Sequence, residues 1–399
     1  MLLLGLCIIA WSLLGYTAGK KAAKKLKNQG TLYTLPSYYG YYVALWTALP
    51  PMGILLLSII ELPLPFLMEI REYLPWIFLN LMGLIGFFYA YSRIKPKFNA
   101  RVKVEGVVQF LFFLTSFAAI LTSLGIILSL FFEAMRFFQI VSFTDFLFGT
   151  QWSPQLAKQD PAHAFGIIPL FSGTLLITFI ALLVATPLGL FSAIYLSEFA
   201  SPSYRTVLKP FLEMLAGVPT VVYGFFAVIM VTPLLQNIGG FLNFDVSSES
   251  ALGVGIVIGV MLIPFISSLS DDVIRAVPIS LKDAGLGLGA TQAEVICHIV
   301  LPAALPGIVG AILLALSRAI GETMIVVMAA GLSAQLTGNP LKAVTTVTVQ
   351  IVSLLTGDQE FNSPQTLAAF ALGLVLFCVT LCLNMIALKV MRSFREQYD

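Results

Sequence analysis

Long apolar runs recur along this chain, and they limit the folds open to it more than any other feature. Only 11% of the residues are charged and 58% are hydrophobic, so the chain has too few charges to cover a water-facing surface. A helix needs about 20 apolar residues to cross a hydrocarbon core of about 30 Å. All the runs except the first, marginal one reach that length. We therefore expect an all-α polytopic membrane protein with about nine transmembrane helices, at residues 1–16, 38–60, 74–92, 106–132, 166–196, 211–235, 251–270, 304–332 and 367–390.

The Lys and Arg residues predict how these spans are oriented. The cations in the segments after the first, third and ninth runs alternate correctly to lie on one side of the membrane. With that side in the cytoplasm, 17 Lys and Arg lie inside, four lie outside and Arg318 remains in the membrane. Cytoplasmic loops carry the excess of cations, so we expect the N-terminus outside and the C-terminus inside. The first run has no cationic leader before it, which favours an uncleaved anchor.

The chain divides into two parts at a basic stretch, "RIKPKFNARVKVE". Residues 1–100 hold three predicted spans and form a membrane extension. Residues 101–399 hold six predicted spans and two long outer loops, 133–165 and 333–366, which are polar enough for short helices or a partner. No sequence repeat and no low-complexity segment appears.

The predicted cytoplasmic loop "SLKDAGLGLGATQAEVICHIVLPAALPG", residues 280–307, is rich in small residues. It predicts a short helix over 280–286, a glycine turn, and a second helix over 291–299 that ends at "LP". Small residues allow close approach to a partner, and glycine permits a turn with positive φ. Pro302 then opens the next span, where its missing N–H costs nothing.

The spacing within this loop resembles the coupling motif of ABC importer permeases, in the form EAA-x3-G-x9-I-x-LP. The matching residues are Asp283, Ala284, Gly285, Gly289, Ile299, Leu301 and Pro302. Asp283 stands in place of Glu, and Gly285 in place of the second Ala. The resemblance implies that the loop docks in a groove of a separate ATPase subunit. The alternative is an ordinary amphipathic hairpin at the membrane surface.

The stretch "SRAIGETM" places Arg318 and Glu322 inside an apolar span. If the span runs over 304–332, Arg318 lies near its middle, where a charge costs at least about 2.5–3.5 kcal/mol on insertion scales. Two residues four apart on a helix share a face and can pair. One interpretation is a structural ion pair. The other is an anion path, because the guanidinium offers planar, permanent donors to an oxyanion, with Glu322 restraining Arg318 while the path is empty.

The same stretch resembles phosphate-specific permeases of the PstC and PstA type, as does "LAGVPTVVYGFF" at residues 215–226. There Gly217 and Pro219 can interrupt a helix, while Thr220 and Tyr223 offer hydroxyl groups. The segment "FTDFLFGTQWSP", residues 143–154, resembles PstC-type subunits specifically. The resemblance covers about 106–390 and implies a six-span, type I (MetI-like) permease core. The expected path residues are Arg318, Glu322, Thr323, Thr220 and Tyr223.

The resemblance also implies partners. We expect a homologous PstA-like permease, a dimer of ATP-binding subunits, an external phosphate-binding protein, inorganic phosphate and the lipid bilayer of a prokaryotic inner membrane. We expect no cofactor, no metal and no nucleic acid. The chain has no GxxxxGK[ST] motif, so ATP hydrolysis is expected in the separate subunit.

Other interpretations and residues stay open. A permease for molybdate, tungstate or sulfate would share the coupling loop. A secondary anion carrier would usually show an inverted repeat, and a membrane enzyme would need a convergent catalytic set. Asp271 and Asp272 end a span, where we expect them to be solvated. Glu198 and Glu213 flank a short cytoplasmic loop and are expected to pair with Arg205 or Lys209.

Overall fold

The structure, a computed structural model, describes residues 2–28, 32–59, 74–158, 164–356 and 362–395. Within these ranges every named element is a helix, and only isolated β-bridges occur. The fold is therefore all-α, as predicted. The chain forms two compact units, Met1–Leu124 and Gly125–Asp399. The boundary falls inside one long helix, α4 (Ala100–Phe137).

The first unit is built on three helices, α1 (Leu2–Lys27), α2 (Pro36–Ile59) and α3 (Leu74–Ser92). Polar groups inside this bundle are hydrogen-bonded to each other. Trp11 on α1 donates its indole N–H to the Asn80 side chain of α3 over 2.9 Å. The fully buried Tyr39 donates its hydroxyl to the Phe98 carbonyl over 2.7 Å. Such pairing is expected where water is absent.

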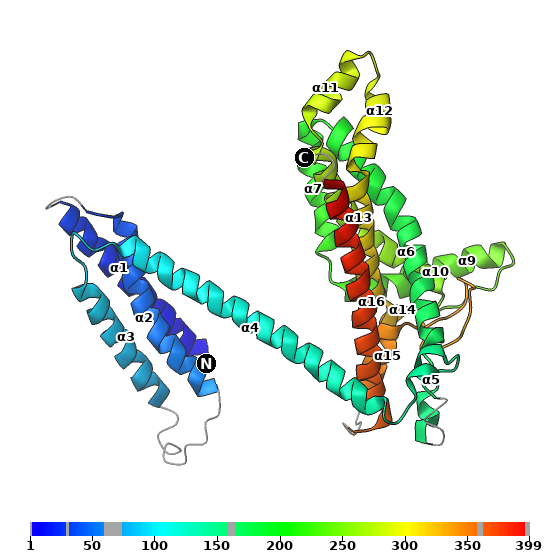
Figure 1. The fold of residues 1–399 in the computed structure, drawn as a ribbon, viewed down its shortest axis with the longest axis horizontal. Coiled ribbons are helices and arrows are strands. Elements are labelled where there is room, and N and C mark those ends of the chain that lie inside the picture. Colours follow the sequence, from blue (N-terminus) through cyan, green and yellow to red (C-terminus); the bar gives the residue numbers. More distant parts are fainter. Residues whose placement is uncertain (1, 29–31, 60–73, 159–163, 357–361, 396–399) are drawn as a thin grey trace. The chain divides into compact units, whose positions relative to one another are not determined.

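The second unit contains the long helices α6 (Ile168–Ile194), α10 (Ala251–Ala276), α13 (Leu301–Ile320) and α16 (Pro364–Arg395) (Figure 1). Helices α6 and α10 pack closely. A side chain at Gly255 or Gly259 of α10 would collide with Ile180 or Val184 of α6. Small residues allow this approach, as in other membrane helix pairs. The resulting core includes residues of α8 and α14 as well.

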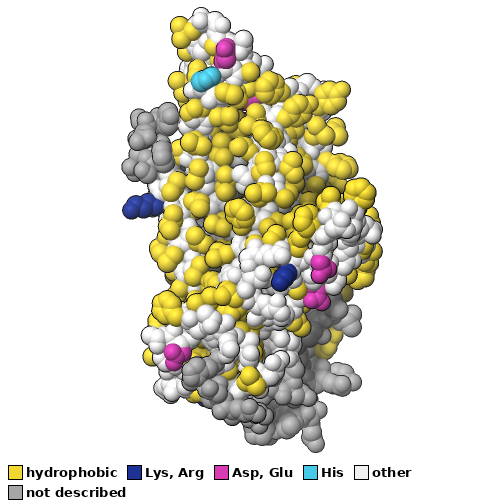
Figure 2. Space-filling model, turned by 90° about the vertical axis from the view of Figure 1, so that its right-hand side faces the viewer, with side chains coloured by type: hydrophobic (Ala, Val, Ile, Leu, Met, Phe, Trp, Pro, Cys, Tyr) yellow, Lys and Arg dark blue, Asp and Glu magenta, His cyan; other side chains and the backbone are white. Residues whose placement is uncertain are grey.

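Six described helical segments are long and apolar enough to cross a membrane: 100–137, 168–199, 220–241, 251–276, 292–320 and 364–390. Helix α3 contributes a shorter apolar segment, Trp76–Ser92. The count of nine spans is therefore not confirmed. Figure 2 shows one face of the second unit, where hydrophobic side chains predominate and charged ones are few. This surface suits a lipid environment.

The span expected at 211–235 is present, but it begins at Thr220, after the interruption that Gly217 and Pro219 predict. Helix α7 (Pro202–Ala216) ends at Gly217, and a new helix, α8 (Thr220–Phe226), begins after Pro219. A π-turn, η4 (Ala227–Val231), and α9 (Thr232–Phe241) continue it. The residue before a proline disfavours the helical region, which explains the interruption. Helix α7 is a separate amphipathic segment.

The described parts of the two long loops, 133–165 and 333–366, contain short helices, as predicted. Helix α5 (Phe143–Phe148) and the 3₁₀ turn η2 (Pro154–Lys158) lie in the first loop. Helix α15 (Val347–Leu355) lies in the second. Trp152 donates its indole N–H to Gln350 over 2.9 Å and so ties the two loops together.

Candidate functional site

Helix α13 ends at Ile320, and a short helix, α14 (Met324–Ala329), begins after a break. The continuous span expected over 304–332 is therefore wrong. Arg318 lies in the last turn of α13 and not at the middle of a longer helix. Gly321, a poor helix former, occupies the C-cap position. The break exposes backbone groups that need other partners.

Glu322 supplies partners at this break. One of its carboxylate oxygens accepts the Ile325 N–H at the start of α14, over 3.4 Å. Its backbone carbonyl accepts the Thr348 hydroxyl over 3.0 Å. The side chain of Thr323 donates to the Gly321 carbonyl over 3.2 Å. Glu322 is 9% exposed, so its carboxylate is largely removed from water, and the Ile325 N–H is the hydrogen-bond donor that the described residues supply to it.

Arg318 and Glu322 do not form the expected ion pair in the described structure. Because the helix ends at Ile320, the register that would place them on one face does not continue to Glu322. The Arg318 side chain is exposed on the isolated chain, and its guanidinium carbon lies 5.8 Å from the ring centre of Phe265 on α10. A cation over a ring gains a modest attraction. Among the described residues, the Arg318 guanidinium has no carboxylate within ion-pair distance.

The two helix breaks meet in one apolar core. A side chain at Gly224 of α8 would contact Met328 and Ile325 of α14. Tyr223 is 8% exposed and donates its hydroxyl to the Leu215 carbonyl of α7 over 2.8 Å. Thr220 is half-buried at the start of α8. Tyr223 thus closes the end of α7, while Thr220 keeps a hydroxyl near the break.

A buried polar network beside Glu322 was missed by the sequence interpretation. Thr346 and Thr348 hydrogen-bond to each other over 3.0 Å. The Gln350 amide donates to the Leu332 carbonyl over 3.1 Å and to Thr345 over 3.2 Å. The sequence feature that could have revealed this network is the run of polar residues in "TTVTVQ", residues 345–350. The network joins the break after α13 to the outer loop.

The predicted coupling loop forms two helices joined by a turn. They are α11 (Ile279–Gly287) and α12 (Gln292–Val295). Gly289 between them has a φ of +87°, which favours glycine. Thr291 and Glu294 form a reciprocal cap at the start of α12. Both helices lie at one end of the second unit (Figure 1).

We expected the second helix of this loop to end at "LP", and in the structure it does not end there. A π-turn, η5 (Ile296–Val300), carries it directly into α13, which begins at Leu301 and Pro302. Proline fits here because the first turn of a helix needs no N–H from it. Gly285 is buried, and a Cβ there would lie 2.6 Å from Ile299 and 2.9 Å from Val295. The missing side chain at Gly285 therefore allows α11 to pack closely against Ile299 and Val295.

Other motif residues face outward. Asp283 and Ala284 are exposed on α11, and Leu288 at the tip of the loop is 90% exposed. The accessible surface of this loop therefore carries an acidic side chain and an apolar tip.

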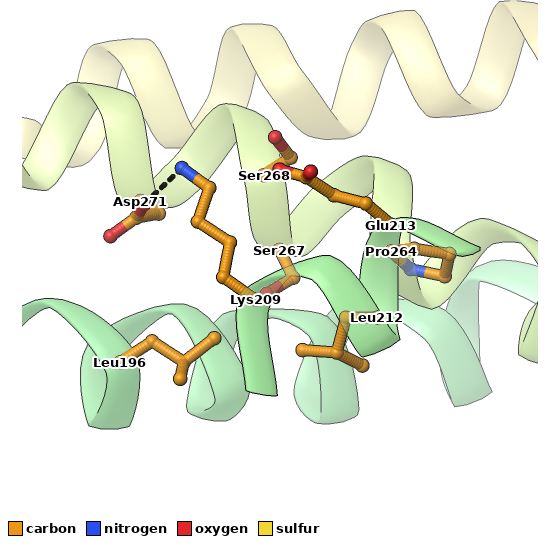
Figure 3. A pocket seen from close by; sticks show the side chains of 8 residues that line it. All are labelled: Leu196, Lys209, Leu212, Glu213, Pro264, Ser267, Ser268 and Asp271. Atoms are coloured by element: carbon orange, nitrogen blue, oxygen red, sulfur yellow. Dashed lines mark hydrogen bonds and ion pairs between the residues drawn. The ribbon is translucent and has the colours of Figure 1, made fainter. Parts of the chain in front are cut away.

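Asp271 is not solvated, contrary to expectation. It is 1% exposed, whereas Asp272 is 67% exposed. Arg205 of α7 donates to both Asp271 oxygens, over 2.7 and 3.1 Å, and Lys209 donates over 2.8 Å. Figure 3 shows Lys209 reaching across a small pocket toward Asp271. Three charge-assisted hydrogen bonds from these two cations therefore anchor α7 to α10.

The hydrogen bond to Asp271 is the main cause that raises the pKa of Lys209 above its ordinary value. A raised lysine pKa means that folding favours the charged form. The stabilisation is complete below the ordinary lysine pKa and is lost only as pH rises through the raised value. The anchor therefore persists throughout the neutral range.

Glu198 has a different partner from the expected Arg205 or Lys209. It lies in η3 (Tyr195–Phe199), the π-turn that ends α6. Its carboxylate pairs with Lys282 of α11 over 2.6 Å. The fold brings 198 and 282 together although they are far apart in sequence, so local spacing could not reveal the pair.

Comparison with known proteins gives two family matches. The family described as binding-protein-dependent transport system inner membrane component matches residues 185–395. The family described as phosphate ATP-binding cassette transporter matches residues 5–74.

Individual relatives agree with these matches. The chain is similar to the phosphate transport system permease protein PstC of Pasteurella multocida, with 33% identity over 292 residues, covering 68% of this chain and 87% of that protein. It is 32% identical to the probable ABC transporter permease protein YqgH of Bacillus subtilis, covering 60% of this chain and 75% of that protein. A chain of the inward-facing MetNI methionine ABC transporter aligns with 15% identity and a TM-score of 0.43, covering 57% of this chain and 94% of that chain.

Proposed function

The chain belongs to the binding-protein-dependent transport system inner membrane component family and is a permease of the phosphate ABC importer, PstC type, and we propose that it forms half of a phosphate path. A homologous PstA-like subunit supplies the other half. The observation that carries this proposal is the guanidinium of Arg318, which lies beside a helix break without an ion-pair partner in the described structure.

Arg318 is the proposed anion contact. A cation in an apolar segment is costly and is retained where it serves a path or a partner. The planar donors of a guanidinium match a phosphate oxyanion. A single exposed contact also binds weakly enough to release the anion, which transport requires.

The other residues that we assign to the path lie at or next to the two helix breaks. Glu322 shapes the break by capping α14, which is a positioning role and replaces the restraint of Arg318 that the sequence suggested. Thr220 and Thr323 offer hydroxyl groups near the two breaks. The Tyr223 hydroxyl is bonded to Leu215, so Tyr223 supports the wall of the path.

The loop at 280–302 is the proposed contact with the ATP-binding dimer. Asp283, Ala284 and Leu288 present its outer surface, and Gly289 forms its turn. Leu301 and Pro302 connect it to α13, the helix that carries Arg318. ATP hydrolysis is assigned to the separate subunit, and phosphate delivery to an external binding protein.

The protein is a multi-pass inner membrane protein, as its family and its apolar helices indicate. We place the N-terminus outside and the C-terminus in the cytoplasm. Residues 1–100 form a membrane extension, and residues 101–399 form the permease core. Epitopes at either end, tested for access in intact cells, check this orientation. An N-terminal epitope that is reached only from the cytoplasm would contradict it.

Replacing Arg318 with glutamine tests the path. We expect Arg318→Gln to abolish phosphate uptake while the transporter still assembles, because the amide removes the charge but keeps much of the side chain. Uptake of radioactive phosphate and co-purification with the ATPase measure the two effects. Arg101→Gln, in the first unit, is the control and should transport normally. Normal uptake by the Arg318 variant would refute the assignment.

Two further measurements separate the alternatives. Molybdate, tungstate and sulfate should fail to compete with phosphate for uptake. Transport by the wild-type protein should require the ATPase subunit, which a secondary carrier would not need.

A further inference from the structure

We propose that Glu198 fastens the coupling loop to α6 and transmits movement of the ATPase to that helix. The inference rests on the proposed function, because it requires the loop at 280–302 to be the ATPase contact. Glu198 is a positioning residue in this role, since it acts through the helices and not on the anion.

Glu198 holds both helices of the loop. Its carboxylate accepts from Lys282 of α11 over 2.6 Å. Its backbone carbonyl accepts from the Gln292 side chain, at the start of α12, over 2.8 Å. We call these three residues the Glu198 clamp. The clamp lies at the end of α6, on the side where the loop projects (Figure 1).

The ion pair in the clamp is well shielded from solvent. The side chains of Glu198 and Lys282 are 10% and 21% exposed. Fully exposed ion pairs contribute little to stability, whereas shielded, hydrogen-bonded pairs are stronger. The ion pair in the clamp can therefore keep α6 and α11 together when the loop moves, which a solvent-exposed pair would do less well.

Chain connectivity explains why a clamp is needed. Helix α11 follows α10 after Val277 and Pro278, and η5 continues into α13. Movement of the loop therefore reaches α10 and α13 through the backbone. Helix α6 has no such link to the loop.

Apolar contacts alone would leave the position of α6 relative to the coupling loop poorly defined. Ala193 near the end of α6 packs in one cluster with Val295 and Val300. Apolar contacts are non-directional, so these surfaces can slide. An ion pair and a hydrogen bond at one residue fix the register between α6 and the loop.

Helix α6 packs closely along α10, with Ile180 against Gly255 and Val184 against Gly259. It also contributes Ile177 and Ala181 to the core that holds Ala315 and Ala319 on either side of Arg318. A displacement at Glu198 thus reaches the walls around the proposed anion contact.

The test uses the complete transporter in liposomes, with the second permease, the ATPase dimer and the binding protein. In Glu198→Gln we expect the phosphate transported per ATP hydrolysed to fall about two- to fivefold, the range expected for losing one ion pair. ATP hydrolysis itself should continue. Glu213→Gln, an exposed acid on α7, is the matched control and should keep the wild-type ratio.

A charge exchange separates a specific clamp from general damage. Glu198→Lys should uncouple transport, and adding Lys282→Glu in the same chain should restore the ratio, because the ion pair re-forms with reversed polarity. If Glu198→Gln does not assemble, Gln292→Ala removes only one hydrogen bond and should still lower the ratio.

An unchanged ratio in the assembled Glu198→Gln transporter, or no restoration by the charge exchange, would overturn the clamp. The proposed function fails separately, if the wild-type protein does not transport phosphate with ATP or if Arg318→Gln transports normally.

Discussion

At the residue scale, Asp271 shows why charge spacing along a sequence is a weak guide to burial. It adjoins Asp272, yet one carboxylate is buried and the other is exposed. On α10, consecutive residues point in different directions. Arg205 and Lys209 of α7 hydrogen-bond to Asp271, whereas Asp272 has a longer, 3.7 Å contact with Lys209. The sequence predicts the helix, but the position of α7 depends on the tertiary fold.

We expect Asp271→Asn to destabilise the protein by about 2 kcal/mol. Removing one partner of a buried pair costs about 3–5 kcal/mol, and the partial exposure of Arg205 and Lys209 reduces that cost. Unfolding in detergent with added denaturant measures the change, and protease cleavage within α7 should accelerate. Asp272→Asn is the control. Equal stability of the two variants would mean that the anchor contributes nothing.

At the element scale, the sequence predicts the helices better than it predicts their continuity. The break at Gly217–Pro219 was predicted because proline and glycine mark it. The break at Gly321–Thr323 was not, because the apolar residues of α14 extend the run past it. Hydropathy shows that a segment is apolar but not whether its helix is continuous. Arg318 was therefore expected at the middle of a span, although it lies near the end of α13. The glycine turn of the coupling loop was predicted, and Gly289 confirms it.

Two glycines on α11 test the packing of the coupling loop. We expect Gly285→Val to lower ATP-driven phosphate uptake strongly, because a Cβ there meets Val295 and Ile299. Gly287→Val is a matched control on the same helix, since a Cβ at that position meets nothing within 4 Å. Uptake and ATPase co-purification measure the effect. Similar losses in both variants would point to helix propensity instead of packing.

At the scale of the whole molecule, the two units have separate cores. The clusters around Tyr39 and around Leu79 lie in the first unit, and the other clusters, including the two largest, lie in the second. The inner membrane component family matches only the second unit, at 185–395. The proposed path and coupling loop also lie entirely there.

We therefore expect a chain truncated to residues 99–399 to retain phosphate uptake. By the proposed orientation its new N-terminus lies in the cytoplasm beside Arg101 and Lys103, which agrees with the distribution of cations. Uptake normalised to the amount of protein in the membrane is the measurement. Loss of uptake with normal assembly would show that the extension takes part in transport.

The unpaired guanidinium of Arg318 has an electrical consequence. Moving one elementary charge across a membrane costs about 2.3 kcal/mol per 100 mV, and a negative cell interior opposes an entering anion. The end states fix the total work. A monovalent phosphate beside Arg318 forms a neutral pair, however, which lowers the free-energy cost of holding the anion away from water at that point of the path. Had Glu322 paired with Arg318, the three groups together would have kept the charge of the anion, and the cost of holding the anion there would have been higher.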